Sequence, residues 1–326
     1  MAAPMTLAST PSLIIACCRA GVVGGFQASN AGPPDVFAAW YDQIAEAETQ
    51  ARRRGERFAP FVVNLLANAG LDAQAQAARL SVCAAHRAPL LLTTAGDPSA
   101  IVEAAHGWGG RVFHDATTLR HVDKAVAAGV DGLMLVTAGS GGLSGTLNPF
   151  AFVAEARRRF DGVIILAGGI ADGRGVAAAL ALGADMVCMG TRFIATQESG
   201  APDAYRDMLI AAGMDDVLYT PALAGIPANF LRPSIVDNGL DPDRLPPLTA
   251  ARRPDLPPGV RAWRTLWSAG HSVSLIDDAP GVGDVVDRLV AQFDAQPHGA
   301  GWRERLAQRL AEPRGANALA AHGGET

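Results

Sequence analysis

Three segments of this chain repeat one short design, and this repeat limits the available folds more than any other feature. The segments are "CCRAGVVGGF" (17–26), "AVAAGVDGLML" (125–135) and "ALALGADMVCM" (179–189). Each starts as the end of an Ala-rich helix, passes through a glycine of the kind that follows helix C-termini, and enters a short apolar strand at once. Because a helix followed directly by a buried strand is half of a β-α-β unit, the repeat predicts parallel strands alternating with helices.

Further strands of the same kind complete the pattern. Apolar runs occur at "FVVN" (61–64), "PLLLTT" (89–94), "RVFH" (111–114) and "GVIILAGG" (162–169), and "AAPM" (2–5) is a short first strand. Runs without polar alternation are typical of parallel strands buried on both faces. Eight strands alternating with helices predict a (β/α)8 TIM barrel. The rival, an open doubly wound sheet, requires a Gly-rich fingerprint after its first strand, and "APMTLAST" contains no glycine.

The regular pattern breaks after the eighth strand. Residues 201–274 are irregular and rich in proline, most of all in "DPDRLPPLTAARRPDLPPG" (241–259), and we expect them to form a small inserted, loop-rich subdomain. The helical pattern returns at 281–296, so residues 1–200 and 275–312 are assigned to the barrel and 313–326 to a disordered tail. Within the insertion, Trp263 and Trp267 are spaced as on one face of a helix.

Composition favours a globular protein and excludes several classes. The chain has 27 Lys and Arg against 32 Asp and Glu, a net charge of −5, and its arginines are scattered, so nucleic-acid binding has little support. No stretch approaches the roughly 20 apolar residues of a membrane span. Cys17, Cys18, Cys83 and Cys188 form no C-x-x-C pair and no cluster with histidine. This predicts buried thiols in the cytoplasm and no metal site.

Two glycine-containing loops follow the seventh and eighth predicted strands. They read "LAGGIADGRG" (166–175) and "MGTRF" (189–193). In TIM barrels, ligands bind at the carboxyl ends of the strands, and these two loops usually hold phosphate. Gly168 and Gly169 can bring backbone amides close to a phosphate, and Gly190 and Thr191 can add an amide and a hydroxyl. Tight turns alone would explain either loop singly, but both together predict a phosphate site.

The segment "ILAGGIADGRGVAAALALGADMVCMGTRFIATQES" (165–199) strongly resembles the nitronate monooxygenase family, formerly called 2-nitropropane dioxygenases. The resemblance continues in "TAGSGGLSGTLNPFAFVAEAR", "VFHD", "FVVNL", "APM" and "AGHSVSLIDDAP", and it covers most of the chain outside the insertion and the tail. It implies an FMN-binding TIM barrel that catalyses a flavin-dependent monooxygenase reaction. The motifs specify the reaction less than the barrel, because related enzymes include quinone reductases and enoyl-thioester reductases.

The resemblance implies flavin contacts at two apolar or Gly-rich motifs. Ala3, Pro4 and Met5 match the family's first-strand motif, whose backbone and methionine line the flavin ring. Gly141 and Gly142 match the turn after strand six, which lies close to the ring.

Two polar residues at strand ends also match flavin contacts in the family. Asn64 ends the third predicted strand, where the family has a polar contact with the ring. His114 ends the fifth, where relatives have Lys or His near the flavin pyrimidine, and a donor or positive charge there would stabilise the reduced ring. A histidine with satisfied hydrogen bonds at a strand end is the alternative.

The chain departs from the family at Leu143. The family loop typically reads Gly-Gly-His-x-Gly, and its His removes a proton from a neutral nitroalkane. Here the same positions read Gly-Gly-Leu-Ser-Gly (141–145), and leucine cannot accept a proton. Ser144 has no nearby partner base in the sequence to activate it.

Three explanations for Leu143 remain open. The substrates can be nitronates, which arrive already deprotonated, or another base can have taken over, for which His271 in "SAGHSVSL" is the candidate. Alternatively, Leu143 widens an apolar pocket for a quinone or an unsaturated thioester.

The sequence therefore supports three functions. The first is FMN-dependent oxidation of alkyl nitronates with O2 to a carbonyl compound and nitrite. The second is an NAD(P)H-dependent flavin reductase of quinones or enoyl thioesters, and the third is a catalytically silent flavin-binding protein. The expected ligands are small molecules, and a homodimer is compatible with the sequence.

Overall fold

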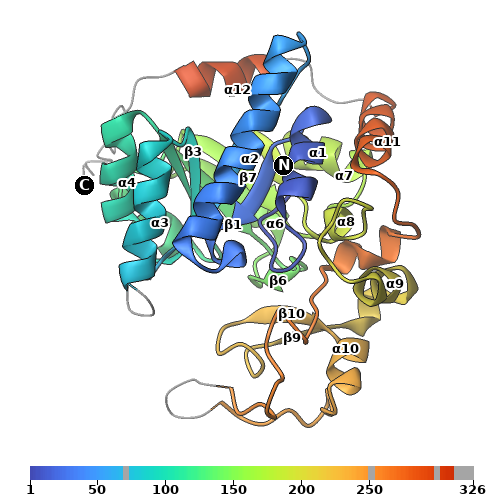
Figure 1. Cartoon of the computed structure of the whole chain (residues 1–326). Helices are drawn as coiled ribbons and strands as arrows, with labels where there is room; N and C mark the ends of the chain where they lie inside the picture. The colour runs from blue at the N-terminus through green and yellow to red at the C-terminus, as the bar shows by residue number, and fades with distance from the viewer. Residues whose placement is uncertain (69–72, 249–253, 297–301, 312–326) are drawn as a thin grey trace, which may run out of the picture.

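A parallel sheet curls through the centre of the computed structural model, which describes residues 1–68, 73–248, 254–296 and 302–311 (Figure 1). The predicted tail, 313–326, lies outside these residues. Seven strands form the sheet in the order β1-β2-β3-β4-β5-β7-β8. They are β1 (Gly24–Gln27), β2 (Phe61–Ala67), β3 (Leu90–Gly96), β4 (Arg111–Ala116), β5 (Gly132–Val136), β7 (Val163–Ala167) and β8 (Met186–Cys188).

Residues 1–3 join the two edges of this sheet. Ala2 forms parallel bridges with both Gly24, at the start of β1, and Met189, just after β8. The Ala2 amide donates to the Val23 carbonyl at 2.8 Å, and the Ala3 amide donates to the Met189 carbonyl at 2.9 Å. The short first strand predicted at 2–5 therefore closes the sheet, and the predicted TIM-barrel fold is confirmed.

Helices connect successive strands and cover the outside of the sheet. They are α1 (Pro11–Arg19), α2 (Pro34–Arg53), α3 (Ala73–Ala85), α4 (Ser99–Trp108), α5 (Leu119–Ala127), α6 (Pro149–Arg157) and α7 (Gly173–Ala181). Side chains of Thr118, Asn148 and Asp172 accept hydrogen bonds from the first-turn amides of α5, α6 and α7, which satisfies groups that a helix start leaves unpaired. After the insertion, α11 (Val282–Asp294) packs against α7 and α1.

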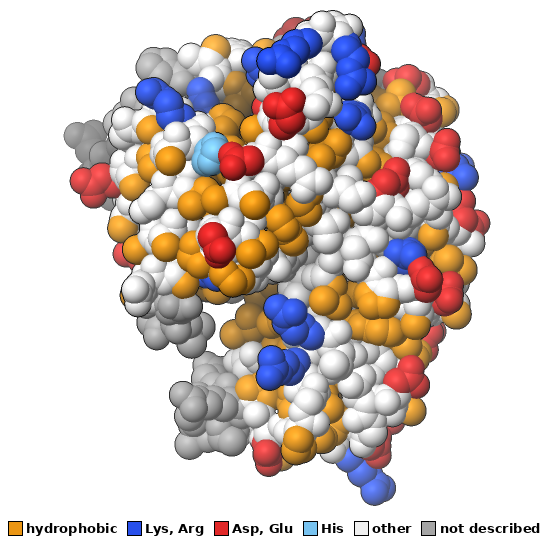
Figure 2. All heavy atoms as spheres, viewed as in Figure 1, with side chains coloured by type: hydrophobic (Ala, Val, Ile, Leu, Met, Phe, Trp, Pro, Cys, Tyr) orange, Lys and Arg blue, Asp and Glu red, His pale blue; other side chains and the backbone are white. Residues whose placement is uncertain are grey.

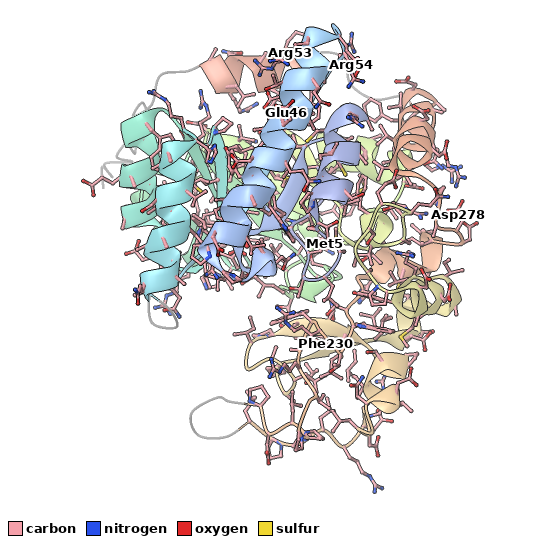
Figure 3. All side chains as sticks on the ribbon, viewed as in Figure 1. Met5, Glu46, Arg53, Arg54, Phe230 and Asp278 are labelled. Carbon is pink, nitrogen blue, oxygen red and sulfur yellow. The ribbon has the colours of Figure 1, made fainter. Side chains whose placement is uncertain are left out.

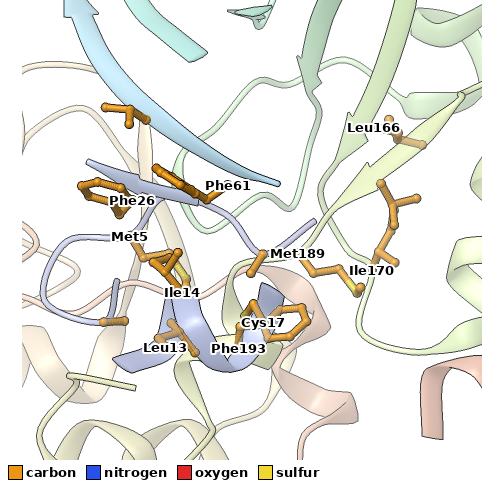
Figure 4. Packing of buried hydrophobic residues seen from close by; sticks show 14 of the residues in the cluster. Met5, Leu13, Ile14, Cys17, Phe26, Phe61, Leu166, Ile170, Met189 and Phe193 are labelled. Atoms are coloured by element: carbon orange, nitrogen blue, oxygen red, sulfur yellow. The ribbon is translucent and has the colours of Figure 1, made fainter. Parts of the chain in front are cut away.

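Side chains of each strand alternate between the barrel interior and the helix layer. The interior cluster includes residues from six strands, among them Val62, Leu92, Phe113, Met134, Ile165 and Cys188. Their chain neighbours, such as Val63 and Val112, belong to a larger cluster with helix residues. Figure 4 shows part of this outer layer, where Ile14 of α1 lies close to Met5. Membership of the two clusters shows which side of a strand a residue faces.

The insertion contributes two strands to a second sheet, whose third strand, β6, comes from the loop after β5. This antiparallel sheet has the order β6-β10-β9 and consists of β6 (Gly142–Leu143), β9 (Val217–Thr220) and β10 (Ala228–Leu231). Helix α10 (Arg232–Asp237) packs against β10, whereas α8 (Thr191–Ile194) and α9 (Asp203–Ala211) pack against the short helical turn at His271–Leu275. A separate apolar cluster around Phe230 and Leu266 holds the second sheet together. The domain boundaries at 200 and 275 stay a prediction.

The expected helical face of Trp263 and Trp267 is wrong. Residues 254–270 contain no helix, and Trp263 has a backbone φ of 61°. Trp263 stacks on Phe230 with ring centroids 5.9 Å apart, whereas Trp267 stacks on Tyr205 at 4.9 Å. The i,i+4 spacing of the two tryptophans therefore does not reflect a helix. Each ring is held by stacking on a different aromatic partner in the insertion.

Helix α12 (Trp302–Ala311) covers the end of the barrel remote from the insertion (Figure 1). Leu306 packs against the interior cluster. Arg309 forms an ion pair with the buried Asp185 at 2.8 Å, and Asp185 also pairs with Arg157 at 2.7 Å and accepts from the Ile164 amide. One carboxylate thus joins α12, α6 and the start of β7.

Replacing Asp185 by Ala should lower the free energy of unfolding by about 3 kcal/mol, because it leaves two largely buried guanidinium groups without their partner. Urea-induced unfolding measures this change. The matched control is Asp123→Ala, which removes an exposed carboxylate paired with Arg159 at 3.3 Å and should cost less than about 1 kcal/mol. Equal losses in the two variants would contradict the role of Asp185.

Candidate active site

The carboxyl ends of the barrel strands face the insertion. β6, in the loop that follows β5, pairs with β10, with Leu143 opposite Ala228 and Gly142 opposite Asn229. Figure 3 places Met5 at the barrel end nearest the insertion and Phe230 on the insertion below it. Figure 2 shows a hollow between the two parts with hydrophobic side chains at its back. We call the strand ends and their loops the barrel mouth.

Glycines let the loops of the mouth approach one another. A Cβ on Gly168, whose φ is 125°, would lie 2.5 Å from Thr137 Oγ1 and 2.7 Å from Ser140 Oγ. A Cβ on Gly141 would lie 2.8 Å from the backbone nitrogen of Gly270. Because real Cβ atoms do not come this close, both residues are required for packing between loops.

The first-strand motif lies beside the loop after β8. A Cβ on Gly190 would contact Met5 Sδ at 3.5 Å and the Ala3 Cβ at 3.7 Å. Pro4 packs against Gly25 of β1, where a Cβ would lie 3.0 Å from its Cδ. The structure therefore brings Ala3, Met5 and Gly190 together.

Within the predicted phosphate site, Gly169 is the glycine whose surroundings leave space beside its backbone. Gly169 has a φ of 70°, and a Cβ there would meet nothing within 4 Å, so its backbone is open to an approaching group. Thr191 Oγ1 accepts from the Gly270 amide at 2.9 Å, which leaves its hydroxyl proton for a further acceptor. This cradle suits a phosphate of the FMN type.

Two backbone amides at the start of α7 are not free to bind a phosphate. The Gly173 amide donates to Gln292 Oε1 at 2.9 Å, and the Gly175 amide donates to Asp172 Oδ1 at 2.8 Å. These amides already have acceptors, so a phosphate would depend on the loop glycines.

Leu143 lies half-buried in the wall of the mouth. Its neighbour Gly142 has a φ of 66°, and a Cβ there would lie 3.5 Å from Trp263 Nε1. Ser144 is buried and accepts from Asn229 Nδ2 at 3.2 Å, while Asn229 Nδ2 also donates to the Ser140 carbonyl at 2.7 Å. Ser144 therefore supports the loop.

His271 packs on the same loop. Its amide donates to the Gly139 carbonyl at 2.9 Å, and a Cβ on Gly139 would lie 2.8 Å from His271 Nδ1. The ring thus lies against the segment that leads to Leu143. Its role as a substitute base stays a prediction.

The two polar strand-end residues face different sides. Asn64 follows the interior residue Val62 by two positions, and its Nδ2 donates to Thr94 Oγ1 at 2.8 Å. His114 lies one position after the interior Phe113, so it faces the helix layer, where its Nδ1 lies 2.8 Å from Thr93 Oγ1. The flavin contact at His114 stays a prediction, and the alternation favours the next residue, Asp115, for the interior.

Asp115 is the polar residue of the mouth that the sequence analysis missed. It is 7% exposed, its Oδ1 accepts from the Ala95 amide at 3.4 Å, and it hydrogen-bonds the Thr94 side chain. Asn64, Thr94 and Asp115 thus form a polar row across β2, β3 and β4. The residues of "VFHD" could not reveal this by themselves, because only the structure shows that Phe113, and therefore Asp115 two positions later, faces the interior.

Burial shifts the pKa of both β4 residues. Desolvation lowers the pKa of His114 to about 4, so its ring is neutral near pH 7. Desolvation raises the pKa of Asp115 to about 6, and hydrogen bonds from Thr94 and Ala95 oppose this shift. A positive charge at His114, one of the two roles expected there, does not fit its surroundings.

Other chemistries find no support in the part of the chain that the structure describes. It contains no group of three or more His, Cys, Asp or Glu that could hold a metal ion. All four cysteines are buried and free, and burial raises the pKa of the interior Cys188 to about 11, so it is a poor nucleophile near neutral pH. Within these residues, no helix combines the length and apolarity needed to cross a membrane.

The sequence profile of the nitronate monooxygenase family matches residues 1–292, and the chain belongs to this family. Membership confirms the resemblance carried by the motifs.

Individual relatives fall into more than one reaction class. A nitronate monooxygenase of Paraburkholderia phytofirmans is 29% identical over 281 residues, or 76% of this chain and 77% of the relative. An octahydroindene-carboxyl-CoA dehydrogenase of Rhodococcus jostii is 30% identical over 69% of this chain and 63% of its own length. FabK of Thermotoga maritima superposes with a TM-score of 0.70 at 28% identity, covering 90% of this chain and 92% of FabK. The chain spans 46%, 63% and 59% of three curated relatives that are 30–36% identical to it.

His114 and Asp115 should have opposite effects on stability between pH 4 and pH 6.5. Because the pKa of His114 falls on folding to about 4, the unfolded chain binds more protons in this range, and acidification destabilises the fold. Because the pKa of Asp115 rises on folding to about 6, the folded protein binds more protons, and acidification stabilises it. Each effect is at most about 3 kcal/mol, so the two largely cancel.

Single substitutions should expose each effect. Relative to the unmodified protein, Asp115→Asn should lose stability on acidification from pH 6.5 to 4, and His114→Gln should gain it. Urea unfolding at several pH values measures both differences. Parallel pH profiles for all three proteins would show that neither group titrates as its surroundings require.

Proposed function

We propose that this protein is an FMN-dependent oxidoreductase that oxidises alkyl nitronates with O2 to a carbonyl compound and nitrite in the cytoplasm. The observation that carries the proposal is Leu143. It pairs with Ala228 of β10 in the wall of the mouth and follows Gly142, where a Cβ would contact Trp263. In the family motif this position has the proton-accepting His. A site without a base at this position suits a substrate that arrives as an anion.

The residues of the mouth would hold FMN in two groups. The open backbone of Gly169, with Gly190 beside Met5 and the hydroxyl of Thr191, suits the phosphate. Met5, Asn64 and the Gly141-Gly142 turn would surround the ring. When bound, FMN supplies the electron-accepting chemistry that none of the amino-acid side chains can provide.

The chain's own contribution is positioning. Asn229 fixes the loop on both sides of Leu143 through its bonds to Ser140 and Ser144. Leu143 and the ring of Trp263 would exclude water from the reacting carbon, which protects a reactive intermediate from hydrolysis.

A reductase is the second candidate. The CoA-ester dehydrogenase relative and the FabK structure support an enzyme that exchanges electrons between NAD(P)H and an unsaturated thioester. In that case Leu143 would form part of an apolar substrate pocket.

An anaerobic absorbance titration of the purified holoprotein separates the two candidates. Bleaching of the flavin by an alkyl nitronate, with none by NADPH, is the result we expect. Bleaching by NADPH alone would replace nitronate oxidation with the reductase function, and bleaching by neither donor would contradict both.

Gly169→Ala should weaken FMN binding at least tenfold, because its methyl group would occupy the space open to the phosphate. The matched control is Gly129→Ala, since Gly129 follows α5 with a φ of 78°, close to the 70° of Gly169. Both variants cost about 1 kcal/mol of backbone strain, so only a difference in FMN affinity reports on the site. Fluorescence titration of apoprotein with FMN measures it, and equal affinities would refute this phosphate cradle.

Leu143→His should raise kcat/KM for neutral nitroethane by about 100-fold or more, the usual contribution of a positioned base, and change kcat/KM for ethyl nitronate little. Leu143→Met serves as the control for altered packing. Steady-state oxygen consumption with each substrate measures both constants. Efficient use of nitroethane by the unmodified protein, unaffected by His271→Ala, would disprove the restriction to anions.

A further inference from the structure

The polar row Asn64, Thr94 and Asp115 places a carboxyl group in the barrel interior at the mouth. Phe113 and Asp115 face the interior from β4, and the register partner of Asp115 on β5 is the interior residue Met134. Flavin rings in barrels lie over this end of the strands. A bound ring would therefore lie against the side of the mouth that carries Asp115.

The backbone of β3 adopts an unusual conformation where it donates a hydrogen bond to the Asp115 carboxylate. Ala95, just after the row on β3, has a φ of 57°, a conformation that non-glycine residues rarely adopt. Its amide donates to Asp115 Oδ1. The register between β2 and β3 shifts at Leu66/Ala67, and such irregularities are frequent next to active sites. Strain of this kind persists where the surrounding structure requires it, which points to function.

Among the described residues, no cation lies close enough to Asp115 to affect its pKa. Asn64 on β2, Thr94 and Ala95 on β3 and Met134 on β5 surround it, and none is charged. No ion pair involves Asp115 in the part of the chain that the structure describes. His114 and α5, which carries His121 and Lys124, lie on the helix side of β4. A second negative charge placed beside Asp115 would meet no opposing charge.

We infer that Asp115 is the proton acceptor coupled to reduction of the bound flavin ring. The inference rests on the proposed binding of FMN. Reduction of the neutral ring by an electron pair and one proton leaves it with one negative charge, and repulsion between this charge and a carboxylate in a low dielectric is strong. A second proton, released by the buffered solvent, forms an O–H bond on the carboxylate and converts it to the carboxylic acid, so the reduced site has taken up two electrons and two protons in all. Asp115 thus acts on the flavin as a positioning and proton-storing residue.

The protonation state of Asp115 while the flavin is oxidised sets the pH range in which reduction is coupled to proton uptake by this residue. Since burial raises the pKa of Asp115 to about 6, the group is ionised above this pH while the ring is oxidised. Below it, the group already carries the proton and cannot take up another. Coupling is therefore confined to pH values above about 6.

The test is the midpoint potential of the FMN holoprotein from pH 5 to pH 8.5, measured with dithionite and reference dyes. Each proton taken up with an electron pair lowers the potential by about 30 mV per pH unit. The unmodified protein should show a slope about 30 mV per pH unit steeper than Asp115→Asn above pH 6, and the same slope below it. Asp123→Asn, which removes an exposed carboxylate on α5, should behave as the unmodified protein.

A second measurement on the unmodified protein keeps the test decisive if Asp115→Asn fails to fold. The reduced-minus-oxidised infrared difference spectrum at pH 7.5 should contain the carbonyl band of a newly protonated carboxylic acid. Equal slopes in the two holoproteins, or no such band, would overturn the role of Asp115 while leaving FMN binding intact. Failure of the unmodified protein to bind FMN would overturn the proposed function and this inference together.

Discussion

Backbone pairing at Ala2 is the constraint on which the rest of the structure depends. Ala2 bridges Gly24 on one side and Met189 on the other, and so turns an open parallel sheet into a closed one. Closure makes every strand end at a common mouth and gives the strands an interior as well as an outside. It also carries Ala3 and Met5 to Gly190, which lies far away in the sequence. The proposed cofactor site exists only because the two edges meet.

Close backbone approach then holds the mouth in shape. Because Gly168 has no Cβ, the side chains of Thr137 and Ser140 can pack against it. For the same reason the backbone of Gly270 can pack against Gly141. The insertion takes part in this packing, since β10 pairs with β6 and Asn229 fixes the loop that contains Leu143. The barrel therefore supplies the cradle, while the insertion sets the wall on the substrate side. Such a division lets substrate preference change without altering the proposed phosphate site.

The electrostatics of β4 link stability to function. His114 and Asp115 are adjacent, yet one faces the helices as a neutral ring and the other faces the mouth as a weakened acid. An uncompensated carboxyl group in the interior destabilises the folded protein near neutral pH. A destabilising residue beside a backbone outlier such as Ala95 is the usual sign of a site shaped for chemistry.

The sequence by itself determined the barrel, because helix ends, their glycines and apolar runs are local signals that recur along the chain. It also located the glycine loops and the departure at Leu143, since these depend on residue identity at matched positions. It could not decide which side of a strand faces the interior: strands buried on both faces show no alternation, so His114 and Asp115 were equivalent until closure distinguished them. The stacking of Trp263 on Phe230 and the covering of the barrel by α12 likewise depend on contacts between distant segments, which only the tertiary structure supplies.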